Sequence, residues 1–114
     1  MRKSDKKIEN NLRDCLTKVC DNALKKIVGF EWITHQVNFN RFPSSLKIVC
    51  VFDTNEHLRA LLEANLKQSL VDEIRFALSE VDIKLKNIEK HIVFDTQEQC
   101  DAVHRGNWAK RLGS

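Results

Sequence analysis

The chain has 114 residues, of which 42% are hydrophobic and 31% charged, and its 19 Lys and Arg outnumber its 16 Asp and Glu. This length supports one domain with a core of its own, and the composition excludes a disordered chain. No apolar run approaches the roughly 18 residues that a membrane-spanning helix needs, and no apolar segment follows the basic residues 1–7 as in a secretory signal. The sequence therefore predicts a single cytoplasmic domain over residues 1–114, with no membrane segment.

The first half of the chain predicts a helix followed by two strands. Apolar residues recur every three or four positions over residues 5–27, as in an amphipathic helix, and Gly29 follows as a stop signal. Residues 33–39 then alternate between apolar and polar side chains, as in a half-buried strand. Residues 46–52 are almost continuously apolar, which is typical of a central strand. Because only a short turn around Pro43 separates the strands, we expect an antiparallel pair with a loop of about five residues.

A long helical segment follows the second predicted strand. Asp53 and Glu56 have the spacing of a capping box, with Asp53 in the cap role. Leucines and other apolar residues then recur with helical periodicity to about residue 81. A length of about 26 residues is high for one helix, so we expect a bend or break near residues 65–69.

The last part of the chain predicts one more strand and one more helix. Residues 91–94 are the third strand, and Thr96 with Gln99 forms a capping box that opens a short helix ending near residue 104. The resulting order is α-β-β-α-β-α. It predicts a two-layer α+β domain in which helices pack on one face of a three-stranded sheet.

The cysteines and histidines do not form a recognisable ligand or catalytic set. Cys15, Cys20, Cys50 and Cys100 are irregularly spaced, so without an export signal we expect reduced thiols. Cys100 and His104 lie four residues apart on one helix face, but zinc sites take four ligands in paired short spacings. His35, on the apolar side of the first strand, is typical of a half-buried histidine bonded to a neighbour. We expect no catalytic residue, metal or cofactor, and hence no enzyme; no glycine-rich phosphate loop is present either.

A six-residue segment occurs twice. The residues Val51–Glu56 recur, with one change, as Val93–Glu98. Both copies lie where an apolar strand end meets a helix, which favours a role in helix capping. The alternative is a carboxylate pair, Asp53 and Asp95, that holds a metal or shares a proton, and it requires two neighbouring strands running the same way.

Positive charge is concentrated at the two ends of the chain. Residues 1–7 and residues 104–114 each carry a net charge of +3, whereas residues 8–103 carry −3. The C-terminal run also interleaves Trp108 with cations, a mixture that pairs base stacking with phosphate contact. The alternatives are that the basic termini are merely solvated and that Trp108 folds back against the core beside the first helix. The candidate nucleic-acid-binding residues are Arg2, Lys3, Lys6, Lys7, Arg105, Trp108, Lys110 and Arg111.

Several segments resemble a family of small proteobacterial proteins commonly labelled "Fis family transcriptional regulator". The segments are Met1–Lys3, Gly29–His35, Phe42–Lys47, Val51–Thr54 and Gly106–Trp108, so the resemblance runs nearly end to end. The label implies DNA binding in transcription regulation, which true Fis proteins perform as dimers with a C-terminal helix-turn-helix. Only eight residues follow Gly106 here, fewer than a recognition helix needs. The α-β-β-α-β order is also similar to KH-like nucleic-acid modules, without their GxxG loop.

Together these observations predict a non-enzymatic cytoplasmic module that binds DNA or RNA through backbone contacts, in a regulatory role. The alternative is a homodimeric or partner-binding protein-interaction module, because a strand at a sheet edge can pair with a copy of itself or with a partner strand.

Overall fold

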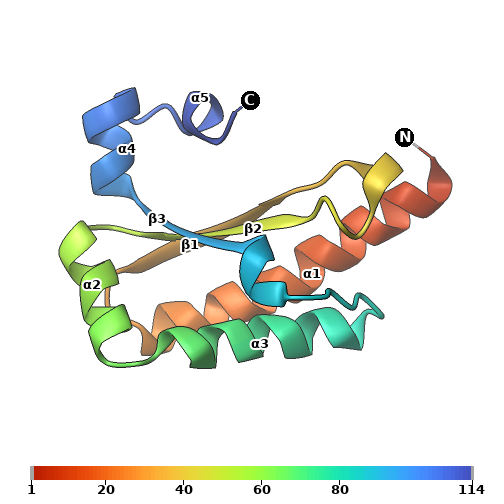
Figure 1. Ribbon diagram of the computed structural model, residues 1–114, viewed down its shortest axis with the longest axis horizontal. Coiled ribbons are helices and arrows are strands. Elements are labelled where there is room, and N and C mark those ends of the chain that lie inside the picture. Colours follow the sequence, from red (N-terminus) through yellow and green to blue (C-terminus); the bar gives the residue numbers. More distant parts are fainter. Residues whose placement is uncertain (1, 114) are drawn as a thin grey trace.

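The structure, a computed structural model, describes residues 2–113 and contains one three-stranded sheet and five α-helices in that part of the chain (Figure 1). The strands are β1 (Phe30–Gln36), β2 (Lys47–Phe52) and β3 (Ile92–Thr96). The α-helices are α1 (Lys3–Lys26), α2 (Asn55–Glu63), α3 (Lys67–Glu80), α4 (Gln97–His104) and α5 (Trp108–Leu112). The predicted α+β class and the order α-β-β-α-β-α are confirmed, with α2 and α3 together in the place of the one long helix.

The sheet is mixed, with β2 in the middle. β1 and β2 are antiparallel, as predicted, and β3 lies parallel to β2 on its other side. Every residue of β2 from Ile48 to Phe52 is fully buried. A strand covered on both faces needs a continuous apolar sequence, which explains why β2 could be recognised as central from its residues alone.

The connection between β1 and β2 is longer than predicted. It spans ten residues, 37–46, and contains a 3-10 helix, η1 (Phe39–Arg41). β1 ends at Gln36 because the next residues form local polar contacts: the Asn38 side chain accepts a hydrogen bond from the backbone amide of Asn40, and the Ser45 hydroxyl donates to the Asn38 carbonyl. Such short-range bonds let Asn and Ser compete with strand pairing.

The main core lies between one face of the sheet and the pair α1 and α3, which run side by side along it (Figure 1). α1 contributes a buried stripe that includes Leu12, Leu16 and Val19, and α3 contributes one that includes Leu70 and Ile74. These are the two layers that the sequence predicted. None of the described helices is long and apolar enough to cross a bilayer.

Two backbone positions with positive φ direct these helices onto the sheet. Gly29, at φ +86°, lies between α1 and β1, where an added Cβ would stand 2.5 Å from the Cβ of His57. Asn65, at φ 59°, separates α2 from α3, which confirms the predicted break. Glycine and asparagine adopt this left-handed conformation more readily than other residues, so the chain can reverse at both places.

The second face of the sheet is covered in part by α4 and α5, which Figure 1 shows on the side opposite α1 and α3. Val49 and Val51 point to this face and are fully buried. The sequence patterns predict helices on one face only, and they do not predict α5. The reason is that α5 has only five residues, too few to show a periodic pattern. Its N-cap is Asn107, whose side chain accepts from the Lys110 amide.

Candidate nucleic-acid interface

One end of the molecule carries an excess of positive charge. α1 begins, β1 passes into β2, and β3 begins at the same end of the sheet, because α1 and β1 run in opposite directions and β2 and β3 are parallel. We define the basic end as residues 2–9, 37–47 and 81–91. It carries nine Lys and Arg against four Asp and Glu. The cations are Arg2, Lys3, Lys6, Lys7, Arg41, Lys47, Lys84, Lys86 and Lys90.

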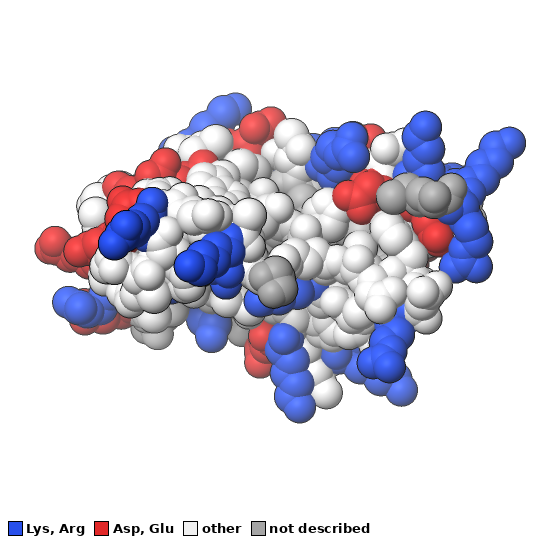
Figure 2. Space-filling model, turned by 90° about the horizontal axis from the view of Figure 1, so that it is seen from above, with Lys and Arg blue, Asp and Glu red and all other residues white. Residues whose placement is uncertain are grey.

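The charge is therefore polarised along the long axis. Figure 2, which views the molecule from the side of α4 and α5, shows Lys and Arg crowded at the end where the chain begins. Most of the Asp and Glu side chains visible in this view lie toward the opposite end. Eight of the nine cations of the basic end are exposed, and Lys47 is half-buried.

The four N-terminal residues of the predicted site are available to a ligand. Lys3, Lys6 and Lys7 are exposed in the first two turns of α1, and Arg2, the residue before the helix, is exposed as well. The Nε of Arg2 lies 3.2 Å from a carboxylate oxygen of Asp5, yet the Arg2 side chain keeps 69% of its surface exposed. Lys3, Lys6 and Lys7 are spaced three and four residues apart, so they project from one side of the helix.

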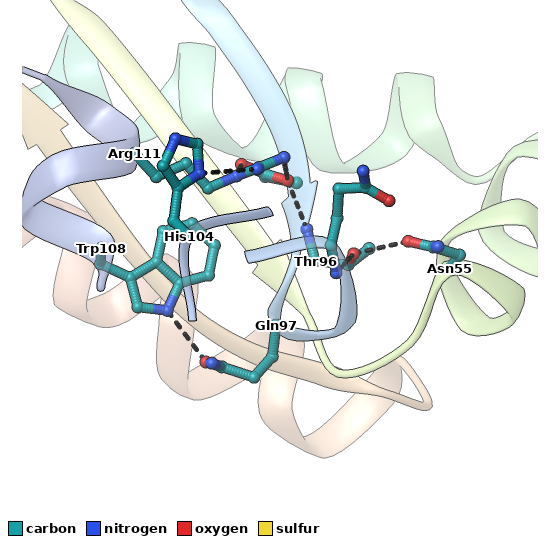
Figure 3. Close-up of polar contacts among 8 residues, drawn as sticks. Asn55, Thr96, Gln97, His104, Trp108 and Arg111 are labelled. Carbon is teal, nitrogen blue, oxygen red and sulfur yellow. Dashed lines mark hydrogen bonds and ion pairs between the residues drawn. The ribbon is translucent and has the colours of Figure 1, made fainter. Parts of the chain in front are cut away.

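Arg111 is instead bound within the fold. Its Nε and Nη2 donate to the two carboxylate oxygens of Asp95 at 2.6 and 2.9 Å, and its Nη1 lies 3.3 Å from Nδ1 of His104 (Figure 3). The Arg111 and Asp95 side chains are only 17% and 15% exposed. The hydrogen bonds to Asp95 raise the pKa of Arg111 above its ordinary value. This residue fastens α5 to β3 and has no free guanidinium edge of the kind that phosphate binding uses.

Trp108 also has a partner inside the molecule. Its ring packs edge-to-face on Trp32 of β1, with the ring centres 4.8 Å apart, and its Nε1 donates to Gln97 (Figure 3). It does fold back, as the alternative proposed, but onto the second face of the sheet, opposite α1. Arg105 and Lys110, the other two C-terminal candidates, are exposed.

The two ends of the chain approach the same end of β1 from opposite faces. On the first face, Glu9 of α1 lies 2.7 Å from Nε2 of His35, which confirms the satisfied, half-buried histidine predicted at this position. On the second face, the carbonyl of Leu112 accepts a hydrogen bond from Gln36. The sheet therefore separates the N-terminal cations from α5, and the two groups do not form one continuous patch.

The repeated segment caps helices and does not build a carboxylate pair. β2 and β3 are parallel neighbours, as the alternative required, but Asp95 lies opposite Val51, so Asp53 is two residues further along. Asp53 is bonded to His57 at 2.7 Å, whereas Asp95 is bonded to Arg111. The predicted cap role of Asp53 is wrong: the caps are Thr54 and Thr96, whose hydroxyl oxygens accept from amides three residues later.

The two copies of the repeat are also bonded to each other, which their sequence does not predict. The Asn55 backbone amide donates to the Glu98 carboxylate at 2.8 Å. The Thr96 hydroxyl donates to the Asn55 side-chain oxygen at 2.6 Å, as Figure 3 shows. The Glu98 amide donates in turn to the Asp53 carbonyl. These contacts join the starts of α2 and α4, and other parts of the chain accept hydrogen bonds from several of the first amides of both helices.

Cys100 and His104 do not face a common ligand. Cys100 is fully buried, and burial raises the pKa of its thiol, whereas His104 points to Arg111. The described residues hold no group of three His, Cys, Asp or Glu side chains close enough to share a metal ion. All four cysteines are free thiols.

Asp53 gives the fold a dependence on pH that can be measured. Burial acts to raise its pKa, but hydrogen bonds from His57 and from the Thr54 amide bring the pKa below its ordinary value of 3.8. The folded state thus favours the charged carboxylate, whose contribution to stability is present above that value and is lost as the pH falls below it. We expect Asp53→Asn to be less stable than the parent protein at pH 6 and to approach it at pH 3, as measured by urea unfolding.

The control for this experiment is Asp21→Asn, a change at an exposed carboxylate of α1. Its stability difference from the parent protein should be small and the same at both pH values. A deficit of Asp53→Asn that does not shrink on acidification would contradict the assignment.

No family model matches the chain, and no curated protein or solved structure shows a significant similarity to it. The resemblance to the Fis-labelled family therefore stays a prediction.

Proposed function

We propose that the protein is a non-enzymatic cytoplasmic module that binds nucleic acid by contacting phosphates at its basic end, in a regulatory role. The observation that carries the proposal is the collection of nine Lys and Arg at one end of a chain whose remaining residues hold ten cations and twelve acids. A surface of this kind attracts a polyanion regardless of its sequence, because each phosphate contact releases condensed counterions.

In this proposal the eight predicted residues have different roles. Lys3, Lys6 and Lys7 project from one side of α1 and make the centre of the proposed surface, with Arg2 beside them. Arg105 and Lys110 lie in the α4–α5 segment, away from the basic end, and in this proposal they add phosphate contacts outside the central surface. Trp108 and Arg111 act in the proposal as structural residues, because the partners described above occupy their polar groups.

β1 and β3 are the two edge strands of the sheet, so the homodimer alternative would use the outer edge of one of them. β1 carries a register irregularity between Phe30 and Trp32, and an exposed charge at Glu31. Bulges and charged residues are features by which edge strands avoid pairing with other chains. We therefore place the nucleic-acid candidate ahead of strand pairing through β1.

Fluorescence anisotropy with labelled single-stranded and duplex DNA and RNA tests the proposal. With six or so phosphate contacts, raising the salt from about 50 to 200 mM should weaken binding about a thousandfold. We expect the triple variant Lys3→Gln, Lys6→Gln, Lys7→Gln to weaken binding at least about tenfold at 50 mM and to lower the salt slope by about three.

The matched control is Lys18→Gln, Lys25→Gln, Lys26→Gln, which removes the same charge from exposed positions of the same helix. It should retain most of the affinity. The proposal fails if no nucleic acid changes the anisotropy at low salt, or if the two triple variants weaken binding equally.

A further inference from the structure

A groove runs between α1 and α3 on the side of these helices that faces away from the sheet. It has a volume of about 890 Å³. Its floor is apolar and includes the buried side chains of Cys15, Val19 and Ala77. Because the opposite sides of the same two helices cover the sheet, this groove lies on the outer side of the helix layer, and its floor is formed by residues that belong to the core.

Phe76 stands at the groove and is the most exposed aromatic side chain of the described residues, at 66%. It lies on α3 one position before Ala77 of the floor, so its ring faces solvent while its neighbour is buried. Exposing a phenylalanine beside an apolar groove forgoes the stabilisation that its burial would give. Aromatic side chains in such places are the common anchors of protein interfaces.

The rim of the groove is acidic, in contrast to the basic end. Asp14, Asp72, Glu73 and Glu80 line it together with a single cation, Lys18. Asp72 also pairs with Arg75 and Glu73 with Lys26; three of these side chains are exposed and Glu73 is partly exposed. Exposed ion pairs contribute little to stability, so a cationic ligand can exchange with them at small cost.

The length of the groove matches a short helix. Its lining residues recur from Asn11 to Asn22 on α1 and from Ser69 to Val81 on α3, about three turns of each. At about 1.5 Å per residue, the groove is roughly 16–18 Å long and fits a ligand helix of about 11 or 12 residues. The geometry points to a docking site for a basic amphipathic helix of a partner protein, with its apolar side on Phe76 and the floor and its Lys or Arg at the acidic rim.

A designed peptide pair tests this inference. The probe is a fluorescein-labelled peptide of 14 residues with Leu at i, i+3, i+4 and i+7 spacing and Lys at the remaining positions, and its counterpart carries Glu in place of Lys. We expect saturable binding of the Lys peptide to the full chain and at least about tenfold weaker binding of the Glu peptide. Phe76→Ala should weaken Lys-peptide binding at least about tenfold, and so should the triple change Asp72→Asn, Glu73→Gln, Glu80→Gln.

Two matched controls separate the groove from general attraction. Val103→Ala shortens another exposed apolar side chain, and Glu31→Gln, Glu56→Gln, Glu63→Gln removes three exposed acids elsewhere. Both should bind the Lys peptide as the parent protein does. Equal losses in the groove and control variants would overturn the inference, and so would equal binding of the two peptides. A groove variant that lowers the molecular mass in light scattering would also overturn it, because the occupant would then be a second copy of the chain.

Discussion

Replacing Arg111 with alanine is expected to lower the free energy of unfolding by about 2–3 kcal/mol, because it leaves the largely buried Asp95 carboxylate without its charged partner. The change also removes the contact to His104 and loosens α5, which covers Val49 and Val51 on the second face of the sheet. Urea unfolding at neutral pH measures the loss.

Lys110→Ala is the matched control, since Lys110 is an exposed cation of the same helix. Its expected effect is below about 0.5 kcal/mol. The double variant Asp95→Ala, Arg111→Ala should be less destabilised than the sum of the two single changes, which is the signature of a direct interaction. A loss for Arg111→Ala as small as that for Lys110→Ala would show that the ion pair does not hold α5.

Phe52→Ala is expected to cost more, about 3–5 kcal/mol, because it removes a fully buried aromatic ring from the end of the central strand. The ring packs edge-to-face on Phe30 at 5.5 Å and lies in the core under α1 and α3. A domain of ordinary stability has only about 5–15 kcal/mol to lose, so the variant should unfold at a much lower urea concentration.

Phe76→Ala provides the comparison, because it removes the same ring from an exposed position. We expect a change within about 0.5 kcal/mol. This result would also establish that a loss of peptide binding in Phe76→Ala comes from the groove and not from unfolding. If the two alanine variants were equally destabilised, the division between core and groove would be wrong.

The elements with strong periodic patterns could be predicted from the sequence. The apolar stripe of α1 and the uninterrupted apolar run of β2 reflect burial on one side and on both sides, respectively, so their residues carry the signal directly. The break at Asn65 could be placed because the apolar pattern was too long for one helix. The residue that caps α2 could not be predicted from the sequence. Asp53 and Thr54 are both good cap residues, and only the backbone conformation selects Thr54.

The roles of the C-terminal residues could not be predicted, because they depend on contacts distant in the sequence. Trp108 contacts Trp32 of β1, and Arg111 contacts Asp95 of β3. Both contacts require the assembled sheet, which presents these two side chains on the face that α5 covers. A tryptophan among cations has the same local sequence whether it stacks on a base or on another tryptophan. The basic end could not be predicted for the same reason. It combines the start of α1 with two connections that lie far along the chain and come together only in the fold.

The parallel pairing of β2 and β3 has a consequence for the order of folding. Gln36 and Lys47 close a short loop between β1 and β2, whereas Ile48 and Ile92 close one of about four times that length. The longer loop costs roughly 1.2 kcal/mol more in chain entropy. The antiparallel pair can therefore form early from local contacts. β3 joins later, after α2 and α3 have formed and shortened the distance between the two ends of the β2–β3 connection. Because α5 requires residues from both edge strands, the second layer of helices closes last.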